Sequence, residues 1–134
     1  MKQQTSAWLE FAARDLAAAK KLLDDEYVAN IVLFHCQQCV EKSLKAILEE
    51  SNQDVPRIHS VNKLYTMIVE NTHIRLPVSD DDLDLIDDVY IDTRYPGSFG
   101  LLPSGFPSQE DAQLLFDIAE KLYEQTVSHF KGIY

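Results

Sequence analysis

The sequence lacks the marks of several protein classes. It contains two cysteines, which are too few for a disulfide framework. It has no apolar stretch of the ~18 residues that a membrane-spanning helix requires. Its first residues are interrupted by Glu10, Arg14 and Asp15, so they do not resemble a secretory signal. We therefore expect a cytoplasmic protein with reduced thiols and no contact with a membrane.

Positive charge is also scarce. The chain has 12 Lys and Arg against 22 Asp and Glu, which gives a formal net charge of −10. Because nucleic acids and anionic lipids are bound through basic surfaces, this balance disfavours both as general ligands. The excess is concentrated in residues 80–95, where seven aspartates accompany a single cation, Arg94. We expect long nucleic acid to bind poorly unless a partner or a second copy supplies cations.

Apolar residues make up 46% of the 134 residues, enough for a core, and we expect a single domain over residues 1–134. Their spacing follows the helical repeat and shows no strand alternation. The helix that the pattern predicts at 26–50 is apolar around most of its circumference, so it should be central or shared with a partner. The pattern favours an all-α fold, an up-and-down antiparallel four-helix bundle with one additional short helix. The predicted helices are 6–24, 26–50, 61–71, 80–94 and 109–130.

Polar residues mark the predicted helix ends. Ser79 and Ser108 each precede an aspartate by three residues, a spacing that predicts a capping box at a helix N-terminus. Ser60 is in position to cap the third helix. Asn52 and Pro56 should end the long helix before them.

A polar stripe interrupts the apolar surface of the long helix. Gln38, Glu41 and Lys45 recur at i, i+3 and i+7, so they line one face. One interpretation is a solvated strip with an ordinary Glu41–Lys45 pair. The other is the wall of a polar cleft that takes a ligand.

Asp15 lies on a stripe of the first helix that otherwise faces the core, seven residues from Trp8 and from Leu22. A carboxylate in such a place must be paired or hydrogen-bonded, because an unpaired buried charge is costly. We interpret Asp15 as a structural residue that tethers two helices. Its candidate partners are Lys42, Lys45 and Arg94.

The acidic segment ends in side chains suited to a nucleotide. Asp87, Tyr90 and Arg94 recur at i, i+3 and i+7, and Tyr95 follows. The planar guanidinium of Arg94 suits a phosphate, and Tyr90 or Tyr95 suits stacking on a base. Alternatively, the group is structural, and Arg94 pairs with one of the nearby carboxylates, Asp87, Asp88 or Asp92.

Signals for metals and cofactors are weak. Cys36 and Cys39 form one C-x-x-C pair with no second pair, and we expect both thiols to fill space in the core. The four histidines form no zinc-binding spacing, and no glycine-rich phosphate loop precedes a helix. We therefore expect neither a metal nor a cofactor.

Four segments, in order along residues 6–130, carry a resemblance to a known family. The first runs from Trp8 to Leu16, and the second, from Phe34 to Ala46, contains the pattern QQ-x-x-EK-x-x-KA. The third is His59-Ser60-Val61-x-x-Leu64, and the last runs from Tyr90 to Pro96 and contains Arg94-Tyr95-Pro96. With these segments the chain resembles the HEPN family of small prokaryotic helical-bundle proteins.

The resemblance implies a helical bundle similar to the C-terminal domain of kanamycin nucleotidyltransferase, commonly as a homodimer. It also implies a partner, a minimal nucleotidyltransferase, often in a toxin–antitoxin-like pair. The activities it implies are nucleotide binding and, in one large subset of the family, metal-independent RNA cleavage.

The ribonuclease subset carries an arginine followed by a histidine four to six residues later. Arg94 is present here, but no histidine lies between His73 and His129, so whether the chain is an enzyme stays open. In a ribonuclease, His59 or His129 would have to fold back to supply the missing proton-transfer group. We expect a nucleotide-binding or accessory protein whose ligand contacts Gln38, Glu41, Lys45, His59, Tyr90, Arg94 and Tyr95. The alternatives are a divergent ribonuclease toxin that uses Arg94 and a purely structural dimerisation module.

Overall fold

The computed structural model describes residues 1–94 and 106–133, except the side chains of 91–94 and 133. Within this part of the chain all regular secondary structure is helical, which confirms the predicted all-α class. No described helix is long and apolar enough to cross a membrane. The elements are α1 (Gln3–Leu22), the 3₁₀ turn η1 (Glu26–Val28), α2 (Ala29–Glu50), α3 (Val61–Asn71), α4 (Asp80–Arg94) and α5 (Gln109–Ile133).

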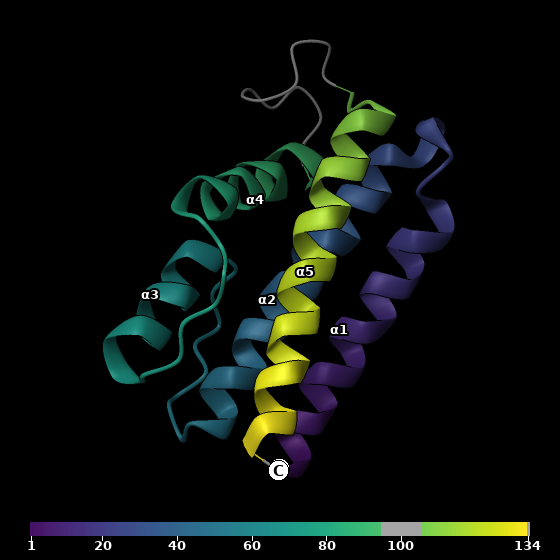
Figure 1. Ribbon diagram of the computed structural model, residues 1–134. Coiled ribbons are helices and arrows are strands. Elements are labelled where there is room, and N and C mark those ends of the chain that lie inside the picture. Colours follow the sequence, from purple (N-terminus) through teal and green to yellow (C-terminus); the bar gives the residue numbers. More distant parts are fainter. Residues whose placement is uncertain (95–105, 134) are drawn as a thin grey trace.

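The helices form a bundle in which α1 and α2 are antiparallel neighbours (Figure 1). Helix α5 begins at the end of the bundle where α2 begins, so it runs antiparallel to α1. Helix α3 is short, and α4 runs across the long helices near the N-terminal end of α3. The bundle therefore brings the end of α4 and the start of α3 to one side of α2.

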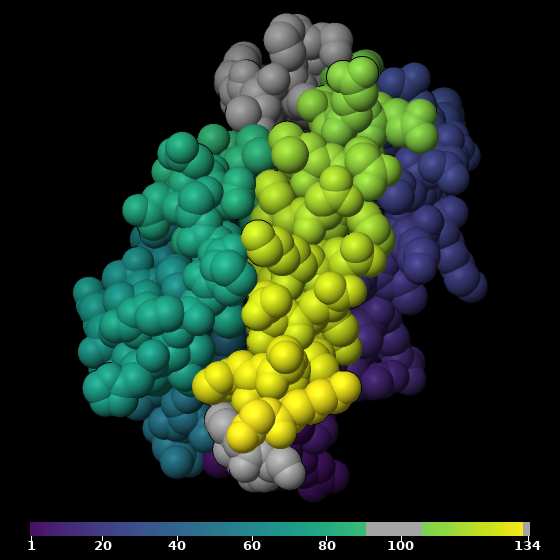
Figure 2. Space-filling view, in the orientation of Figure 1, coloured from purple at the N-terminus to yellow at the C-terminus, as the bar shows by residue number. Residues whose placement is uncertain are grey.

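Helix α2 is the centre of the core, as its apolar circumference predicts. It packs against α1, α3, α4 and α5, and Leu33, Leu44, Ile47 and Leu48 are fully buried. Burial of each such side chain stabilises the fold by about 1.5–3 kcal/mol. Figure 2 shows α5 lying between the α3–α4 side and α1, where it covers most of α2.

The predicted capping residues act as caps. The Ser60 hydroxyl accepts the backbone N–H of Lys63, and the Ser79 hydroxyl accepts that of Asp82. At the start of α5, Ser108 and Asp111 bond reciprocally, the Ser108 hydroxyl to one N–H and the Asp111 carboxylate to the other.

The long helix ends at Glu50, and Asn52, two residues later, has a left-handed backbone with φ of 59°. The N–H of Asn52 donates to the carbonyl of Glu49, and the N–H of Gln53 donates to the carbonyl of Leu48. These two bonds form a Schellman motif, which satisfies carbonyls that the helix leaves unpaired.

Candidate functional site

The structure brings together six polar or aromatic side chains that are distant in sequence. We call them the Glu41 cluster: Gln37, Gln38, Glu41 and Lys45 of α2, His59 of the segment before α3, and Tyr90 of α4. The cluster lies on the side of α2 that faces α3 and α4. Five of its members are side chains that the sequence predicts as ligand contacts, and Gln37 is an addition.

Glu41 and Lys45 form a buried ion pair at the bottom of the cluster. Their relative exposures are 4% and 5%, and Lys45 Nζ lies 3.1 Å from Glu41 Oε2. The i, i+4 spacing on the helix brings the two side chains together. Trp8 of α1 lies against Lys45, and His59, from the segment before α3, contacts Glu41. A buried charge needs a compensating charge and hydrogen bonds, so this part of the stripe is not a solvated strip.

The side chains of Gln37 and Gln38 extend the hydrogen-bond network around the Glu41 carboxylate. The amide of Gln37 donates to Glu41 Oε1 at 3.1 Å and to the carbonyl of His59 at 3.2 Å. Gln38 then donates to Gln37 Oε1 at 2.6 Å. Gln37 therefore fixes the backbone beside His59 as well as the Glu41 carboxylate. Its i, i+4 relation to Glu41 and its place in the QQ-x-x-EK pattern are the sequence signals for this role.

His59 connects this buried network to the surface. Its Nδ1 lies 3.1 Å from Glu41 Oε1, while its side chain is 51% exposed. A carboxylate only accepts hydrogen bonds, so Nδ1 carries the proton, and the lone pair of neutral His59 is on Nε2. The ring stacks on Tyr90, with centroids 5.1 Å apart and planes at 18°. The outcome is an imidazole held by a carboxylate on one edge and an aromatic ring on one face.

Asp15 forms a second network on the α1 side of α2. Its carboxylate lies 2.6 Å from Lys42 Nζ and 2.8 Å from His35 Nδ1. Of the three candidate partners, the structure gives Lys42, which joins α1 to α2. Sequence reasoning missed His35, whose relation to Asp15 depends on how the two helices pack.

Asp87 contacts the N-terminus of α3. Its carboxylate accepts the backbone N–H of Val61 at 2.7 Å, that of Asn62 at 3.3 Å and the hydroxyl of Ser60 at 2.8 Å. Negative charge at this end of a helix is favourable, so Asp87 joins α4 to α3. The Arg94 side chain and Tyr95 lie outside the described residues, as do their predicted contacts.

The two thiols lie in the core. Cys36 and Cys39 are fully buried, and burial raises the pKa of Cys36 to about 12 and that of Cys39 further. The thiol form therefore dominates at neutral pH, and both side chains act as small apolar groups.

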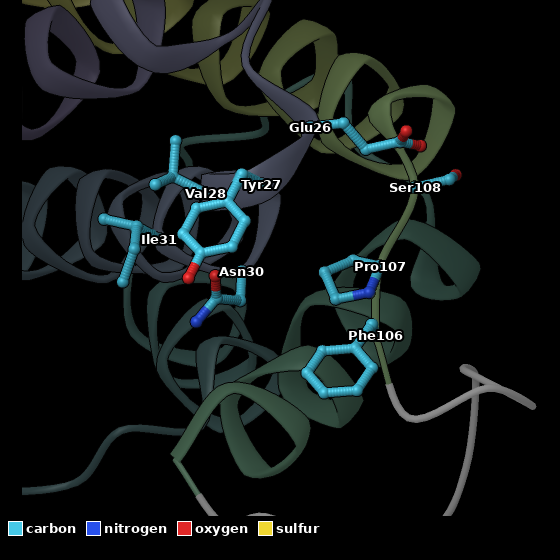
Figure 3. Close-up of a pocket in the computed structure, with 8 residues that line it drawn as sticks. All are labelled: Glu26, Tyr27, Val28, Asn30, Ile31, Phe106, Pro107 and Ser108. Atoms are coloured by element: carbon cyan, nitrogen blue, oxygen red, sulfur yellow. The ribbon is translucent and has the colours of Figure 1, made fainter.

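Sequence reasoning did not predict a pocket that lies at the end of the bundle where α2 and α5 begin. It has a volume of about 880 Å³, with Tyr27 and Asn30 on one side and Phe106 and Pro107 on the other (Figure 3). Tyr27 is 93% exposed and Phe106 80%. Glu26 accepts the backbone N–H of Gln109 at 3.1 Å, which holds the two sides together. Of the predicted site residues whose side chains the structure describes, none lines this pocket.

One family model matches most of the chain, and two solved structures share its fold. The HEPN domain family model matches residues 5–129. The fold is similar to that of TT1696 from Thermus thermophilus, with a TM-score of 0.75 and 24% identity over 95% of this chain and 98% of that one. It is also similar to ST0689, described as an archaeal HEPN homologue, with a TM-score of 0.68 and 24% identity over 96% and 98%. No curated protein matches the chain.

Proposed function

Because the chain belongs to the HEPN domain family, we propose that it binds a nucleotide at the Glu41 cluster. The stacked pair of His59 and Tyr90 supports this proposal most directly. Aromatic and imidazole rings stack on bases, and the exposed edge of His59 is a hydrogen-bonding group for a phosphate or a ribose hydroxyl. Gln38 offers a further polar contact at the edge of the cluster.

The buried members of the cluster have a supporting role in this proposal. Glu41 and Lys45 are too covered to contact a ligand first, so they act by orienting His59. Arg94 is one helical turn beyond Tyr90 in α4, and we propose it as the phosphate contact, with Tyr95 as a second stacking ring. These assignments keep the nucleotide close to the end of α4.

We propose a cytoplasmic accessory role beside a minimal nucleotidyltransferase, in a toxin–antitoxin-like pair, with the chain as a homodimer. The net charge of −10 supports a partner-dependent role. A strongly acidic protein repels polyanions at low salt, so cations from a partner or a second copy would extend the site to a longer nucleic acid.

Thermal unfolding in the presence of nucleotides tests the binding proposal. A ligand at 100 times its Kd adds about 2.7 kcal/mol of stability, which raises Tm by several degrees in a domain of this size. We expect ATP or another ribonucleotide to raise the Tm of the wild type, and Tyr90→Ala to reduce the shift.

Tyr27→Ala is the matched control, because Tyr27 is an exposed tyrosine in the pocket at the end of the bundle. A shift that survives Tyr90→Ala but disappears in Tyr27→Ala would place the nucleotide in that pocket instead. No shift with any nucleotide would reject the binding proposal.

RNA cleavage is a second candidate function, and the contact between Glu41 and His59 favours it. A histidine oriented by a carboxylate is a common proton-transfer pair.

A further inference from the structure

We propose that the pocket between Tyr27 and Phe106, at the end of the bundle where α2 and α5 begin, docks an arginine-containing segment of a partner protein. We call this surface the end pocket. The inference goes beyond nucleotide binding, because none of the six residues of the Glu41 cluster lines the end pocket. The two proposals therefore concern separate surfaces and can fail independently.

Apolar side chains gather around the end pocket. Tyr27 and Phe106 are mostly exposed and lie on opposite sides of it (Figure 3), and Val28, Ile31 and Pro107 also line it. One exposed aromatic residue needs no explanation, whereas several apolar side chains around one hollow are typical of a binding surface. The volume of about 880 Å³ is within the range of roughly 300–1,000 Å³ that holds drug-sized ligands. The end pocket therefore has room for more than one side chain of a partner.

Hydrogen bonds fix the backbone on both sides of the end pocket. Glu26 accepts the backbone N–H of Gln109 at 3.1 Å, and the Gln109 side chain donates to Asp24 at 3.4 Å. The Asp25 carboxylate accepts the backbone N–H of Tyr27 at 3.1 Å. A surface that is ordered before binding loses less conformational entropy when a partner docks. These contacts therefore favour docking on the end pocket as it stands.

The rim of the end pocket is acidic. Residues 24–31 and 106–111, which include all of its lining residues, contain five carboxylates and no lysine or arginine. Asp24, Glu26 and Glu110 are exposed. The N-termini of α2 and α5 each offset only about half a charge, so a negative excess remains. This excess favours a cationic ligand and repels phosphate groups.

Aromatic rings and carboxylates together suit an arginine side chain. The guanidinium group stacks on the faces of aromatic rings and donates hydrogen bonds to carboxylates. The end pocket offers both kinds of group, with Tyr27 and Phe106 as rings and Asp24 and Glu110 as carboxylates. Lysine carries the same charge without the planar group. We therefore expect the end pocket to prefer arginine to lysine.

Other occupants match the end pocket less well. A nucleotide would bring phosphate groups to the negative rim. A second copy of the chain has a net charge of −10, and a symmetric contact through this end would bring two acidic rims together. Residues 95–105 contain no charged residue, so they supply no cation to the rim. The charge of the rim therefore points to a basic segment of a different protein.

Selection from a library of random peptides, carried out on the full wild-type chain, tests the proposal. We expect the selected peptides to be enriched in arginine beside an apolar residue. The most enriched peptide is then synthesised with a fluorescent label, and a second version carries glutamine in place of each arginine. Fluorescence anisotropy measures their binding. The glutamine version should bind at least about tenfold more weakly, and added salt should weaken binding of the arginine version.

Tyr27→Ala tests the aromatic side of the end pocket. We expect it to weaken peptide binding at least about tenfold, because aromatic anchors carry much of the binding energy at interfaces. Its Tm should stay close to that of the wild type, since the Tyr27 side chain is exposed. Phe11→Ala is the matched control, because Phe11 is an exposed aromatic residue of α1 that does not line the end pocket. It should bind the peptide like the wild type.

The double variant Asp24→Asn with Glu110→Gln tests the acidic rim. It should weaken peptide binding and reduce its dependence on salt, because two carboxylates at the rim become neutral. Asp54→Asn with Glu70→Gln is the matched control, since it removes the same charge from exposed positions outside the end pocket. Equal effects of the two double variants would show that only the net charge of the protein matters, and would overturn the proposal.

Three further outcomes would also overturn it. The first is selected peptides without enrichment in arginine, and the second is equal binding of the peptide to wild type and Tyr27→Ala. The third is self-association, measured by sedimentation, that Tyr27→Ala abolishes, because a second copy would then occupy the end pocket. If no nucleotide raises Tm but the arginine peptide binds as expected, the nucleotide proposal fails and this one stands.

Discussion

The carboxylate of Asp87 accepts the backbone N–H of Val61 at 2.7 Å, so helix α4 adds a second cap, beside Ser60, at the start of helix α3. This contact also sets the distance between two residues of the candidate site. His59 lies two residues before Val61, and Tyr90 lies three residues after Asp87. The joint between the helices therefore places the imidazole and the phenol ring face to face.

Asp87→Ala should loosen this joint. We expect a loss of about 1–2 kcal/mol in the free energy of unfolding, because the α3 N-terminus loses a charged cap. Urea denaturation measures the change. Asp88→Ala is the matched control, since Asp88 is the exposed neighbour on the same helix, and its effect should stay within about 0.5 kcal/mol. Equal effects of the two substitutions would contradict the capping role.

Removing one member of the buried ion pair should be costly. Lys45→Met leaves the Glu41 carboxylate buried without its cation, and we expect a loss of about 3–5 kcal/mol in stability. The double variant Glu41→Gln with Lys45→Met should lose much less than the sum of the two single variants. Additive losses in this double-mutant cycle would mean that the two side chains are not energetically coupled.

The thiols should be unreactive in the folded protein. Burial raises the pKa of Cys36 to about 12, so at pH 8 only about one thiol in 10,000 is ionised, and thiolate is the reactive form. Ellman's reagent should label neither cysteine in the native state and both after unfolding in guanidinium. Rapid labelling of native protein at pH 8 would contradict the burial of these side chains.

The contact between the two ends of the α1–α2 hairpin should contribute to acid sensitivity. The backbone N–H of Lys2 donates to the Glu50 carboxylate, which lowers the pKa of Glu50, and the Thr5 hydroxyl adds to this effect. A lowered pKa stabilises the fold above the ordinary glutamate value of 4.5, and this stability disappears as pH falls through the lowered value.

Glu50→Gln should therefore flatten the pH dependence of stability below pH 4.5. Because the carboxylate is accessible to solvent, the difference at neutral pH should not exceed about 0.5 kcal/mol. Urea midpoints of wild type and variant across the acidic range measure it. A variant with an unchanged slope would show that Glu50 does not contribute.

Asn52 should tolerate glycine better than alanine. Its φ of 59° is in the left-handed region, where a Cβ costs about 1–2 kcal/mol unless the side chain is Asn or Asp. Asn52→Gly should leave stability equal or slightly higher, and Asn52→Ala should lower it by about 1 kcal/mol. The comparison of their Tm values is the measurement, and a more stable alanine variant would be inconsistent with the observed backbone.

Local patterns were enough to predict the helices. Ser60, Ser79 and Ser108 begin α3, α4 and α5 because their hydroxyls pair with N–H groups only a few residues away. The first helix was predicted to begin at residue 6, but α1 begins at Gln3. The second was predicted to begin at residue 26, but residues 26–28 form a 3₁₀ turn and α2 begins at Ala29.

The candidate site was only partly predictable. The Glu41–Lys45 pair follows from one turn of helix, so spacing alone indicates it. The contact of His59 with Glu41 spans 18 residues, and it depends on the α3–α4 joint and on Gln37. Such contacts are set by how helices pack, which helical periodicity does not encode.

The single tryptophan of the chain sits beside the candidate site. Lys45 Nζ lies 5.5 Å from the centre of the Trp8 ring, so a cation that belongs to the buried pair borders the only indole. The emission of an indole responds to nearby charge. The protein therefore carries its own fluorophore, and a ligand that shifts Lys45 or Glu41 should change the emission spectrum without any attached label.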